Sequence, residues 1–524
     1  MPFALASVLL SLIALMISFS RGYLLLYGDA VAHLGIARRI LDSRNPGLIQ
    51  LGGVWLPLPH LLMLPFVQKL EWWQNGLAGA WLSLICYIAS VVGFYRLARY
   101  LLTLRWAVAA TLFYALNPNL LYLATTAMTE PLFLALLIWT TLLTVECVAA
   151  IHAARSAVVV RRLIFVGLLV LAAVYTRYDG WILGAIVWCV VTFALARRRD
   201  VWRRVAASFV VFTLLVIAGP LSWLAYNQHF FHDPLDFIRG PYSASAIEKK
   251  TAAPGSEHYH GWHNPFWALV YYTRTAQVDA AFWETGFLVM IAAIGGLAIA
   301  IRRRLALPAL LLWVPLPFYI YSVAYGSVPI FIPQLSPHSY YNSRYGMEML
   351  PALALFGMLA VEWIESRWSR SQPLVKRLGQ PILLLLIALN TVGMMYSTPL
   401  VLKEAMANST TRVAFETAIA RQLRTFPVGS SILMYNSDHV GALQAAGIPL
   451  RQTVNEGDYD SFHAALAAPA AHAAYVVAIA GDPVSAAVAA HPEGLTELTI
   501  LCTSGQPCAR IYQSDRLAAA PPSR

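Results

Sequence analysis

The chain has 524 residues, of which 59% are hydrophobic and only 12% are charged, whereas soluble proteins average about 45–50% and about 25%. This composition indicates an integral membrane protein, and it excludes a nucleic-acid-binding globule, a disordered scaffold and a disulfide-rich mini-protein despite the net charge of +11. Residues 1–404 carry 30 Lys and Arg against 17 Asp and Glu, whereas residues 405–524 carry 7 against 9. We therefore expect a membrane domain over about 1–400 and a soluble domain over 401–524.

Eleven apolar windows free of Lys and Arg approach the roughly 20 residues that a membrane-spanning helix needs. They are residues 3–19, 77–95, 106–122, 130–149, 163–176, 179–196, 205–226, 284–301, 305–325, 346–364 and 380–398. With a cytoplasmic N-terminus, the short Arg-rich connectors face the cytoplasm and the C-terminal domain lies outside. The sequence thus predicts a polytopic α-helical protein of the cell (inner) membrane, whose first helix is retained because no cleavage signal follows it.

The C-terminal segment has the pattern of a small α/β domain. Helix-like stretches at 414–423 and 482–490 alternate with β-rich runs at 431–435, 474–480 and 495–502. Cys502 and Cys508 lie together in this segment. In a periplasmic or extracellular compartment a disulfide is favoured over a metal site or a redox pair.

Three long loops, at about 20–76, 227–283 and 326–345, are expected on the outer face, which indicates that something is bound and processed there. In the first loop Asp29 opens a helix that would lie along the interface. Asp29 is interpreted either as a helix cap or as a site carboxylate at the membrane surface. His33, one turn further on, would face the same side.

The first loop continues through Trp55-Leu56-Pro57-Leu58-Pro59-His60. Its two prolines fix the backbone and stop a helix before His60. The run predicts a rigid wall with an aromatic surface, from which Trp55 and His60 could contact a substrate.

Charged residues at membrane depth are functional candidates, because burying a charge there costs at least about 2.5 kcal/mol. Glu130 opens the fourth predicted span, where a carboxylate also suits the helix dipole. Arg177 and Asp179 lie in a turn that we expect below the outer interface, because only 34 residues separate Arg162 from Arg197 and two full spans need about 40. They either pair with each other or hold an anionic ligand.

Arg344 precedes the tenth predicted span within His338-Ser339-Tyr340-Tyr341-Asn342-Ser343-Arg344-Tyr345. A planar guanidinium among tyrosines suits a phosphate in the headgroup layer, with Tyr345 and His338 beside it. A snorkelling anchor is the alternative.

Two further clusters carry weaker signals. Glu257 to His263 includes three histidines that could bind zinc, although no element fixes their geometry. Asp458-Tyr459-Asp460 mimics paired carboxylates for a metal-bound nucleotide sugar, but a surface turn is the favoured interpretation.

The charged and proline-rich motifs follow one another in a recognisable order. They are Asp29 after the first span, Ala37-Arg38-Arg39-Ile40-Leu41, Trp55-Leu56-Pro57-Leu58-Pro59, Thr129-Glu130-Pro131-Leu132-Phe133, Thr176-Arg177-Tyr178-Asp179-Gly180, and Arg344-Tyr345 before Leu350-Pro351-Ala352-Leu353. Over about residues 1–400 this order resembles the GT-C superfamily of membrane glycosyltransferases. The nearest resemblance is to bacterial relatives of dolichyl-phosphate-mannose protein mannosyltransferases and of the lipid A aminoarabinose transferase.

The resemblance implies transfer of a sugar from a polyprenyl-phosphate donor to a protein, lipid or glycan acceptor outside the cytoplasm. Asp29 matches the catalytic aspartate, Glu130 the second acidic residue, and Arg344 the basic residue near the donor phosphate. No cofactor is expected to be required, although a divalent cation is possible. Asp29 is followed by Ala30 where the mannosyltransferases have a second acid, and Trp55 stands where aminoarabinose transferases have a lysine, so the sugar and the acceptor stay open.

Two alternatives remain at this stage. A flippase or transporter of lipid-linked sugars would place polar sites near the midplane of the membrane, whereas the ionisable residues here gather towards one face. An oligosaccharide polymerase or ligase would use a diphosphate-linked donor instead of a monophosphate.

Overall fold

The computed structural model describes residues 2–251, 258–368 and 373–517. This part of the chain forms two compact units. The helical unit comprises Met1–Ser18, Gly53–Pro59 and Leu82–Glu404. The sheet unit comprises Phe19–Gly52, His60–Trp81 and Ala405–Arg524. The first loop, residues 20–76, is thus divided, and most of it belongs to the same unit as the C-terminal segment.

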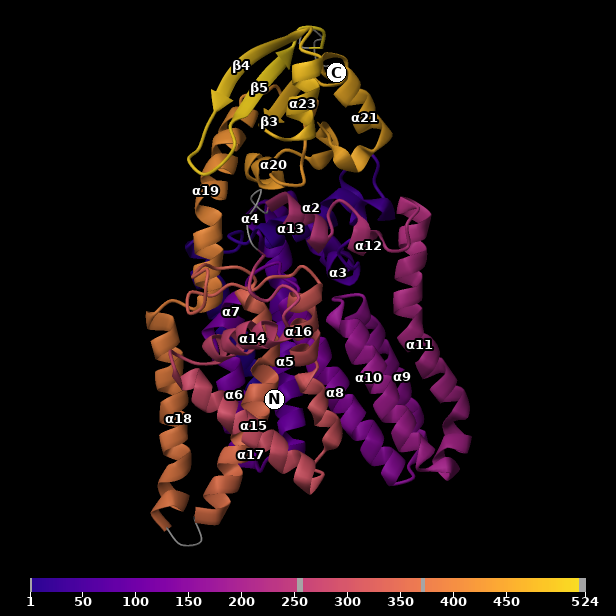
Figure 1. Ribbon diagram of the computed structural model, residues 1–524, viewed down its shortest axis with the longest axis vertical. Coiled ribbons are helices and arrows are strands. Elements are labelled where there is room, and N and C mark those ends of the chain that lie inside the picture. Colours follow the sequence, from indigo (N-terminus) through magenta and orange to yellow (C-terminus); the bar gives the residue numbers. More distant parts are fainter. Residues whose placement is uncertain (1, 252–257, 369–372, 518–524) are drawn as a thin grey trace. The chain divides into compact units, whose positions relative to one another are not determined.

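Ten helices in the described ranges are long and apolar enough to cross a membrane. The protein is therefore a multi-pass membrane protein. The apolar helices are α1 (Pro2–Ser20), α5 (Leu77–Leu101), α8 (Glu130–His152), α9 (Ser156–Val174), α10 (Asp179–Ala196), α11 (Arg199–Phe231), α15 (Thr285–Arg303), η2 with α16 (Leu307–Trp313 and Pro315–Tyr325), η3 with α17 (Ser343–Met349 and Leu350–Trp368), and α18 (Pro373–Tyr396). In Figure 1, α9, α10 and α11 lie side by side, and each contacts the other two.

Ten of the eleven predicted windows correspond to these helices, and the window at 106–122 does not. The chain there forms α6 (Leu104–Ala115) and α7 (Pro118–Leu123), which are each too short to count as a span. Asn117 caps α7 by accepting hydrogen bonds from the backbone of Asn119 and Leu120. Pro118 follows at the first helical position, where it has no N–H to continue α6.

The remaining helices of the helical unit are short and lie in its loops, except for α14. They are α12 (Asp236–Arg239), α13 (Ala244–Thr251) and α14 (Pro265–Ala280).

Close packing in the unit depends on small residues. Gly296 on α15 faces the backbone of Phe356 on α17 so closely that a Cβ atom would collide with the carbonyl group, so glycine lets the two helices approach.

Within the described residues of the sheet unit, five strands form one sheet in the order β2-β1-β3-β5-β4. Strand β1 pairs in parallel with β2 and β3, and β5 pairs antiparallel with β3 and β4. The strands are β1 (Ile432–Met434), β2 (Thr453–Val454), β3 (Tyr475–Ile479), β4 (Leu495–Leu501) and β5 (Ala509–Ser514). The predicted β-rich runs are therefore confirmed, and β2 and β5 are additional.

Helices from both ends of the sequence complete the sheet unit. From the first loop come α2 (Gly28–Leu41), η1 (Leu48–Leu51), α3 (Leu58–Val67) and α4 (Leu70–Asn75). From the C-terminal segment come α19 (Leu400–Leu423), α20 (Val440–Ala446), η4 (Leu450–Gln452), η5 (Glu456–Asp458), α21 (Asp460–Ala467), α22 (Pro469–His472) and α23 (Pro483–Ala490). Leu433, Val476 and Val484 lie in an apolar core between the sheet and its helices.

Polar contacts of buried side chains of the first loop and of the C-terminal segment join the two within the sheet unit. The amide of Gln50 donates to the carbonyl of Gly457 at 2.8 Å, and the amide of Gln444 donates to the carbonyl of Trp73 at 2.5 Å. The carboxylate of Asp42 accepts a hydrogen bond from Nη1 of Arg451 at 3.1 Å. Because unpaired buried polar groups are costly, these contacts fix the loop against the sheet.

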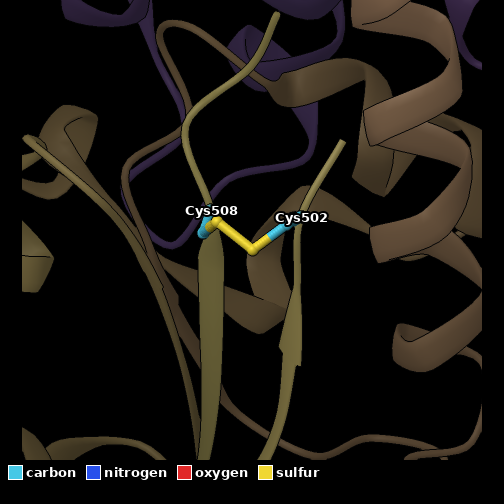
Figure 2. Close-up of a disulfide and its surroundings, with 2 residues drawn as sticks. All are labelled: Cys502 and Cys508. Atoms are coloured by element: carbon cyan, nitrogen blue, oxygen red, sulfur yellow. A yellow bond between two sulfur atoms is a disulfide. The ribbon is translucent and has the colours of Figure 1, made fainter. Parts of the chain in front are cut away.

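The predicted disulfide between Cys502 and Cys508 is confirmed. Figure 2 shows the bond joining the end of β4 to the chain just before β5. It closes the short connection between two antiparallel strands. Two of the three free cysteines, Cys86 and Cys147, are buried.

Replacing both disulfide cysteines with serine should destabilise the sheet unit by about 2 kcal/mol, because cross-linking so short a loop removes about that much denatured-state entropy. The measurement is the unfolding midpoint in detergent, followed with and without reductant. The reduced wild type should match the Cys502→Ser/Cys508→Ser variant. A midpoint that reductant lowers equally in both proteins would contradict this account.

Candidate functional site

Glu130, the first residue of α8, is held by two arginines that are distant in sequence. Its Oε1 atom accepts hydrogen bonds from Nη1 of Arg177 at 3.2 Å and from Nε of Arg344 at 3.1 Å. All three side chains are 14% exposed or less. The structure therefore brings together three of the ionisable residues that the sequence singled out.

Arg177 lies in the turn between α9 and α10, and its guanidinium is surrounded by acceptors. Nη1 donates to Oγ1 of Thr129 at 2.8 Å, and Nη2 donates to the hydroxyl of Tyr319 at 2.6 Å. Glu348 lies 3.2 Å from Nη2, and Asp179 lies 3.5 Å from Nε. The expected pair with Asp179 therefore exists, but it is one contact among several.

Arg344 lies in η3, and Glu404 at the start of α19 holds that segment. The Glu404 carboxylate accepts from the backbone N–H of Asn342 at 2.9 Å and of Ser343 at 2.7 Å, and also from the Ser343 hydroxyl. Arg344 donates from Nη1 to the same carboxylate at 3.3 Å. A carboxylate that collects this many donors fixes both the backbone and the guanidinium that follows it.

Stacked tyrosines close one side of this cluster. The Tyr319 ring lies between Tyr272, at 4.7 Å, and Tyr345, at 5.0 Å between ring centroids. The guanidinium carbons of Arg177 and Arg344 lie 5.1 and 4.9 Å from the Tyr345 ring centre. Because these separations suit cation–π attraction, Tyr345 contributes to holding both charges.

Among the described residues, the cluster combines two guanidiniums with four carboxylates, namely Glu130, Asp179, Glu348 and Glu404. Glu130 and Asp179 each begin a helix, where the dipole offsets roughly half a negative charge. Burial by itself lowers the pKa of Arg177, but Tyr319 and the carboxylates outweigh burial and raise that pKa above its ordinary value.

Two carboxylate oxygens of the cluster are buried without a hydrogen-bond partner in the described part of the chain. They are Oε2 of Glu130 and Oε2 of Glu348. A buried acceptor of this kind needs a donor. With Oε1 fixed by two arginines, Oε2 of Glu130 is suited to receive a hydroxyl group from a bound molecule.

The sheet unit carries the other predicted catalytic residue, Asp29. It lies half-buried in the first turn of α2. The helix starts two residues earlier than a cap at Asp29 would require, and Tyr27 takes the N-cap position. Leu34, Ala37 and Ile40 of this helix are buried, whereas Leu41 is exposed.

The two histidines of the first loop contact each other within the sheet unit. Nδ1 of His33 lies 2.9 Å from Nε2 of His60, and both side chains are buried. One ring therefore donates to the other, and the pair fixes α2 against α3.

Trp55 belongs to the proline-rich segment of the helical unit, which is bonded to the turn that carries Arg177. The Tyr178 hydroxyl donates to the carbonyl of Val54 at 2.6 Å, and the N–H of Leu58 donates to the carbonyl of Tyr175 at 3.0 Å. The two predicted motifs are thus neighbours. His338 is exposed, and its Nδ1 donates to the carbonyl of Pro333 at 2.8 Å.

Sequence reasoning missed Tyr319, Glu348 and Glu404, which complete the cluster. Glu348 could have been noticed as a charge inside an apolar window. Glu404 follows the last predicted span, where an acidic residue is unremarkable. Tyr319 is one aromatic residue among many and carries no signal of its own.

The two weaker sequence clusters are Glu257 to His263 and Asp458 to Asp460, and their described residues make different kinds of contact. Glu257 lies outside the described residues; His258 pairs with Glu248 at 3.5 Å and stacks on Trp262 at 4.3 Å. Asp458 accepts from the backbone N–H of Asn455 in a capping box, so this carboxylate stabilises a turn. In the part of the chain that the structure describes, no three His, Cys, Asp or Glu side chains are grouped to hold a metal.

Comparison with solved structures reveals the same architecture elsewhere. ArnT, a lipid A aminoarabinose transferase from Cupriavidus metallidurans, aligns over 99% of both chains with a TM-score of 0.58 and 14% identity in its complex with undecaprenyl phosphate. Its apo structure aligns over 99% of both chains with a TM-score of 0.56 and 16% identity. The oligosaccharyltransferase AglB from Archaeoglobus fulgidus covers 90% of this chain and 69% of its own, with a TM-score of 0.47 and 10% identity.

The chain therefore has the GT-C fold that its motifs predict. No protein-family profile and no curated protein sequence matches it.

Asp279 on α14 is fully buried, and neither of its carboxylate oxygens has a hydrogen-bond partner among the described residues. Burial, with a contribution from Glu404, raises the pKa of Asp279 well above its ordinary value. A carboxyl group with a raised folded-state pKa contributes stability at low pH, and this stability is lost as the pH rises through that pKa.

Replacing Asp279 with Asn should remove that pH dependence. Between pH 5 and pH 8 the wild type should lose at least about 1 kcal/mol relative to Asp279→Asn, since one pKa unit corresponds to about 1.4 kcal/mol. The measurement is the unfolding midpoint of both proteins across this pH range. A constant difference between them would show that Asp279 does not titrate there.

Proposed function

We propose that this protein transfers a sugar from a polyprenyl-phosphate donor to an acceptor hydroxyl on the non-cytoplasmic side of the cell membrane. The observation that carries the proposal is the likeness, along 99% of both chains, to the structure of ArnT bound to undecaprenyl phosphate. The multi-pass architecture agrees with a donor whose isoprenoid tail lies in the bilayer. In this proposal residues 1–400 form the membrane domain and residues 401–524 lie on the non-cytoplasmic side.

Asp29 acts as the general base in this proposal. It takes the proton from the acceptor hydroxyl while the hydroxyl oxygen bonds to the anomeric carbon of the sugar. The bond between that carbon and the phosphate oxygen breaks, and polyprenyl phosphate leaves with the electron pair. A phosphate with stabilised charge leaves without a general acid, so the reaction needs a carboxylate only as the base for the acceptor proton.

Glu130 orients the acceptor or the sugar. Its Oε1 atom is fixed by Arg177 and Arg344, and its Oε2 atom is the acceptor that awaits a hydroxyl group. Such a fixed acceptor can hold a substrate hydroxyl in the geometry of reaction, which is a large part of catalytic rate enhancement. We propose that Glu130 and Asp29 act in the same reaction.

Arg344 binds the phosphate of the sugar donor, and Tyr345 lies beside its guanidinium. Arg177 and His338 provide further hydrogen-bond donors to the phosphate. Arg344 now donates to Glu130 and Glu404. An arriving phosphate would compete with these carboxylates for the guanidinium, and phosphate oxygens match its planar donors well. Binding of the sugar donor would then weaken the hydrogen bond from Arg344 to Glu130, so that the Glu130 carboxylate could accept a hydroxyl group.

Trp55 offers an aromatic face to the sugar, while His33, His60 and Asp179 shape the substrate-binding elements on which they lie. The transfer step needs no metal, because guanidinium charge stabilises the leaving phosphate. A divalent cation that arrives with the substrate is compatible with this scheme.

Replacing Asp29 with Asn should lower turnover about 100-fold or more while donor affinity and folding stay nearly unchanged, because the amide cannot accept the proton. The assay follows polyprenyl phosphate released from a polyprenyl-phosphate sugar by the purified protein. Glu71→Gln, at an exposed acid of the same loop, is the matched control and should behave as wild type. Wild-type turnover in Asp29→Asn would refute the assignment of the base.

Replacing Arg344 with Ala should weaken donor binding by roughly 1.5 to 3 kcal/mol, the value of charge-assisted hydrogen bonds. Arg344→Lys should restore only part, because a point charge lacks the planar fork. The measurement is titration of polyprenyl phosphate into each purified variant. Arg239→Ala, at an exposed arginine of the helical unit, is the control.

Arg344 also forms buried ion pairs, so its removal could cost about 3–5 kcal/mol of stability, and each variant is checked by its melting temperature. Unchanged donor affinity in a folded Arg344→Ala or Arg344→Lys protein would remove this residue from the phosphate site.

A further inference from the structure

Arg412, on the C-terminal helix α19, holds the chain immediately before the helix that carries Asp29. Its Nη2 atom donates to the carbonyl oxygens of Leu25 and Leu26, both at 3.0 Å. Tyr27 follows as the N-cap, and Gly28 and Asp29 are the first two residues of α2. A side chain separated by 386 residues from its acceptor thus fixes the first turn of that helix.

The guanidinium of Arg412 is itself held in place. Its Nη1 atom donates to the carboxylate of Glu416 at 2.6 Å, and the two side chains are 14% and 7% exposed. The Glu416 carboxylate lies against α20 at Gly441, where a Cβ atom would collide with it. His439 lies 3.9 Å from the same carboxylate. The Arg412 guanidinium is therefore held rigidly, because its partner Glu416 is packed between α19 and α20.

The start of α2 depends on this outside support. Tyr27 occupies the N-cap position, whereas helix starts are normally fixed by the short side chains of Ser, Thr, Asp or Asn. Further along, α2 packs on α20, since a Cβ atom on Gly35 would lie 3.4 Å from Val440. The C-terminal segment thus contacts both the body of α2, through Val440, and the chain at its start, through Arg412.

We propose that Arg412 is a positioning residue for Asp29, and that the C-terminal domain contributes to the reaction by positioning this general base. This inference rests on the proposed function, in which Asp29 takes the proton from the acceptor. Reacting groups must lie within a fraction of an ångström of their working positions, and a shift of about 1 Å can cost about 100-fold in rate. Two hydrogen bonds to the residues just before Asp29 provide that constraint.

The test is a double-mutant cycle of wild type, Arg412→Ala, Asp29→Asn and the double variant, with the full-length protein. Arg412→Ala should lower kcat about 10-fold or more, while the affinity for polyprenyl phosphate changes less than about twofold, because Arg412 acts on the base and not on the donor. In the Asp29→Asn background, Arg412→Ala should lower the residual rate by less than about twofold, because a base that is absent cannot be misplaced. A merely structural role would reduce both backgrounds by the same factor.

Two further variants keep the test decisive if Arg412→Ala folds poorly. Arg412→Lys should retain an intermediate kcat, since one ammonium group cannot reproduce the forked donors. Glu416→Gln should also be intermediate, because Arg412 then loses its charged partner. Arg510→Ala is the matched control, since this exposed arginine of the same domain pairs with Glu497, and it should show wild-type kcat.

Wild-type kcat in folded Arg412→Ala or Arg412→Lys, beside a slow Asp29→Asn, would overturn the positioning role and leave the proposed function intact. Equal losses in both backgrounds would do the same. Wild-type turnover in Asp29→Asn would instead overturn the assignment of the base, and the positioning role with it.

Discussion

The carboxylate of Glu130 accepts from two guanidiniums at once, and the interior of the helical unit is organised around that contact. Arg177 comes from the turn between α9 and α10, and Arg344 from η3 ahead of α17. Each arginine could be buried only with carboxylate partners, because an unpaired buried charge is prohibitively costly. The shared acceptor therefore ties together the starts of three apolar helices, while its second carboxylate oxygen has no hydrogen-bond partner among the described residues.

In the sheet unit the first loop is held against the C-terminal segment, and this loop carries Asp29, the proposed general base. Loops at a membrane surface lack a core of their own, so their side chains are placed only as well as their supports allow. Here the first loop shares a compact unit with the C-terminal segment, through contacts of Gln50 and Asp42 and through the backbone carbonyls that accept hydrogen bonds from Arg412. The domain that seemed an appendage in the sequence is part of the scaffold of that loop.

Apolar windows predicted ten of the spans because a run of about 20 apolar residues has few other uses. The prediction of a span at 106–122 was wrong, because it overlooked Asn117-Pro118, a helix cap followed by proline. The disulfide followed from cysteine spacing and compartment. Glu130, Arg177 and Arg344 were recognisable one by one as charges where charges are costly. Their mutual contacts were not, because Arg344 and Glu130 lie 214 residues apart and such a pairing leaves no local pattern. Glu404 and Tyr319 escaped notice for the same reason.

The central claim is that this fold breaks the bond between a sugar and a polyprenyl monophosphate. The most direct measurement presents purified protein in sealed vesicles with two labelled donors, a polyprenyl-phosphate sugar and a polyprenyl-diphosphate oligosaccharide, together with an acceptor extract. The account predicts that the monophosphate donor loses its sugar to an acceptor hydroxyl and that an equal amount of free polyprenyl phosphate appears. Label that crosses the vesicle membrane with its carrier bond intact, or consumption of the diphosphate donor alone, would contradict it.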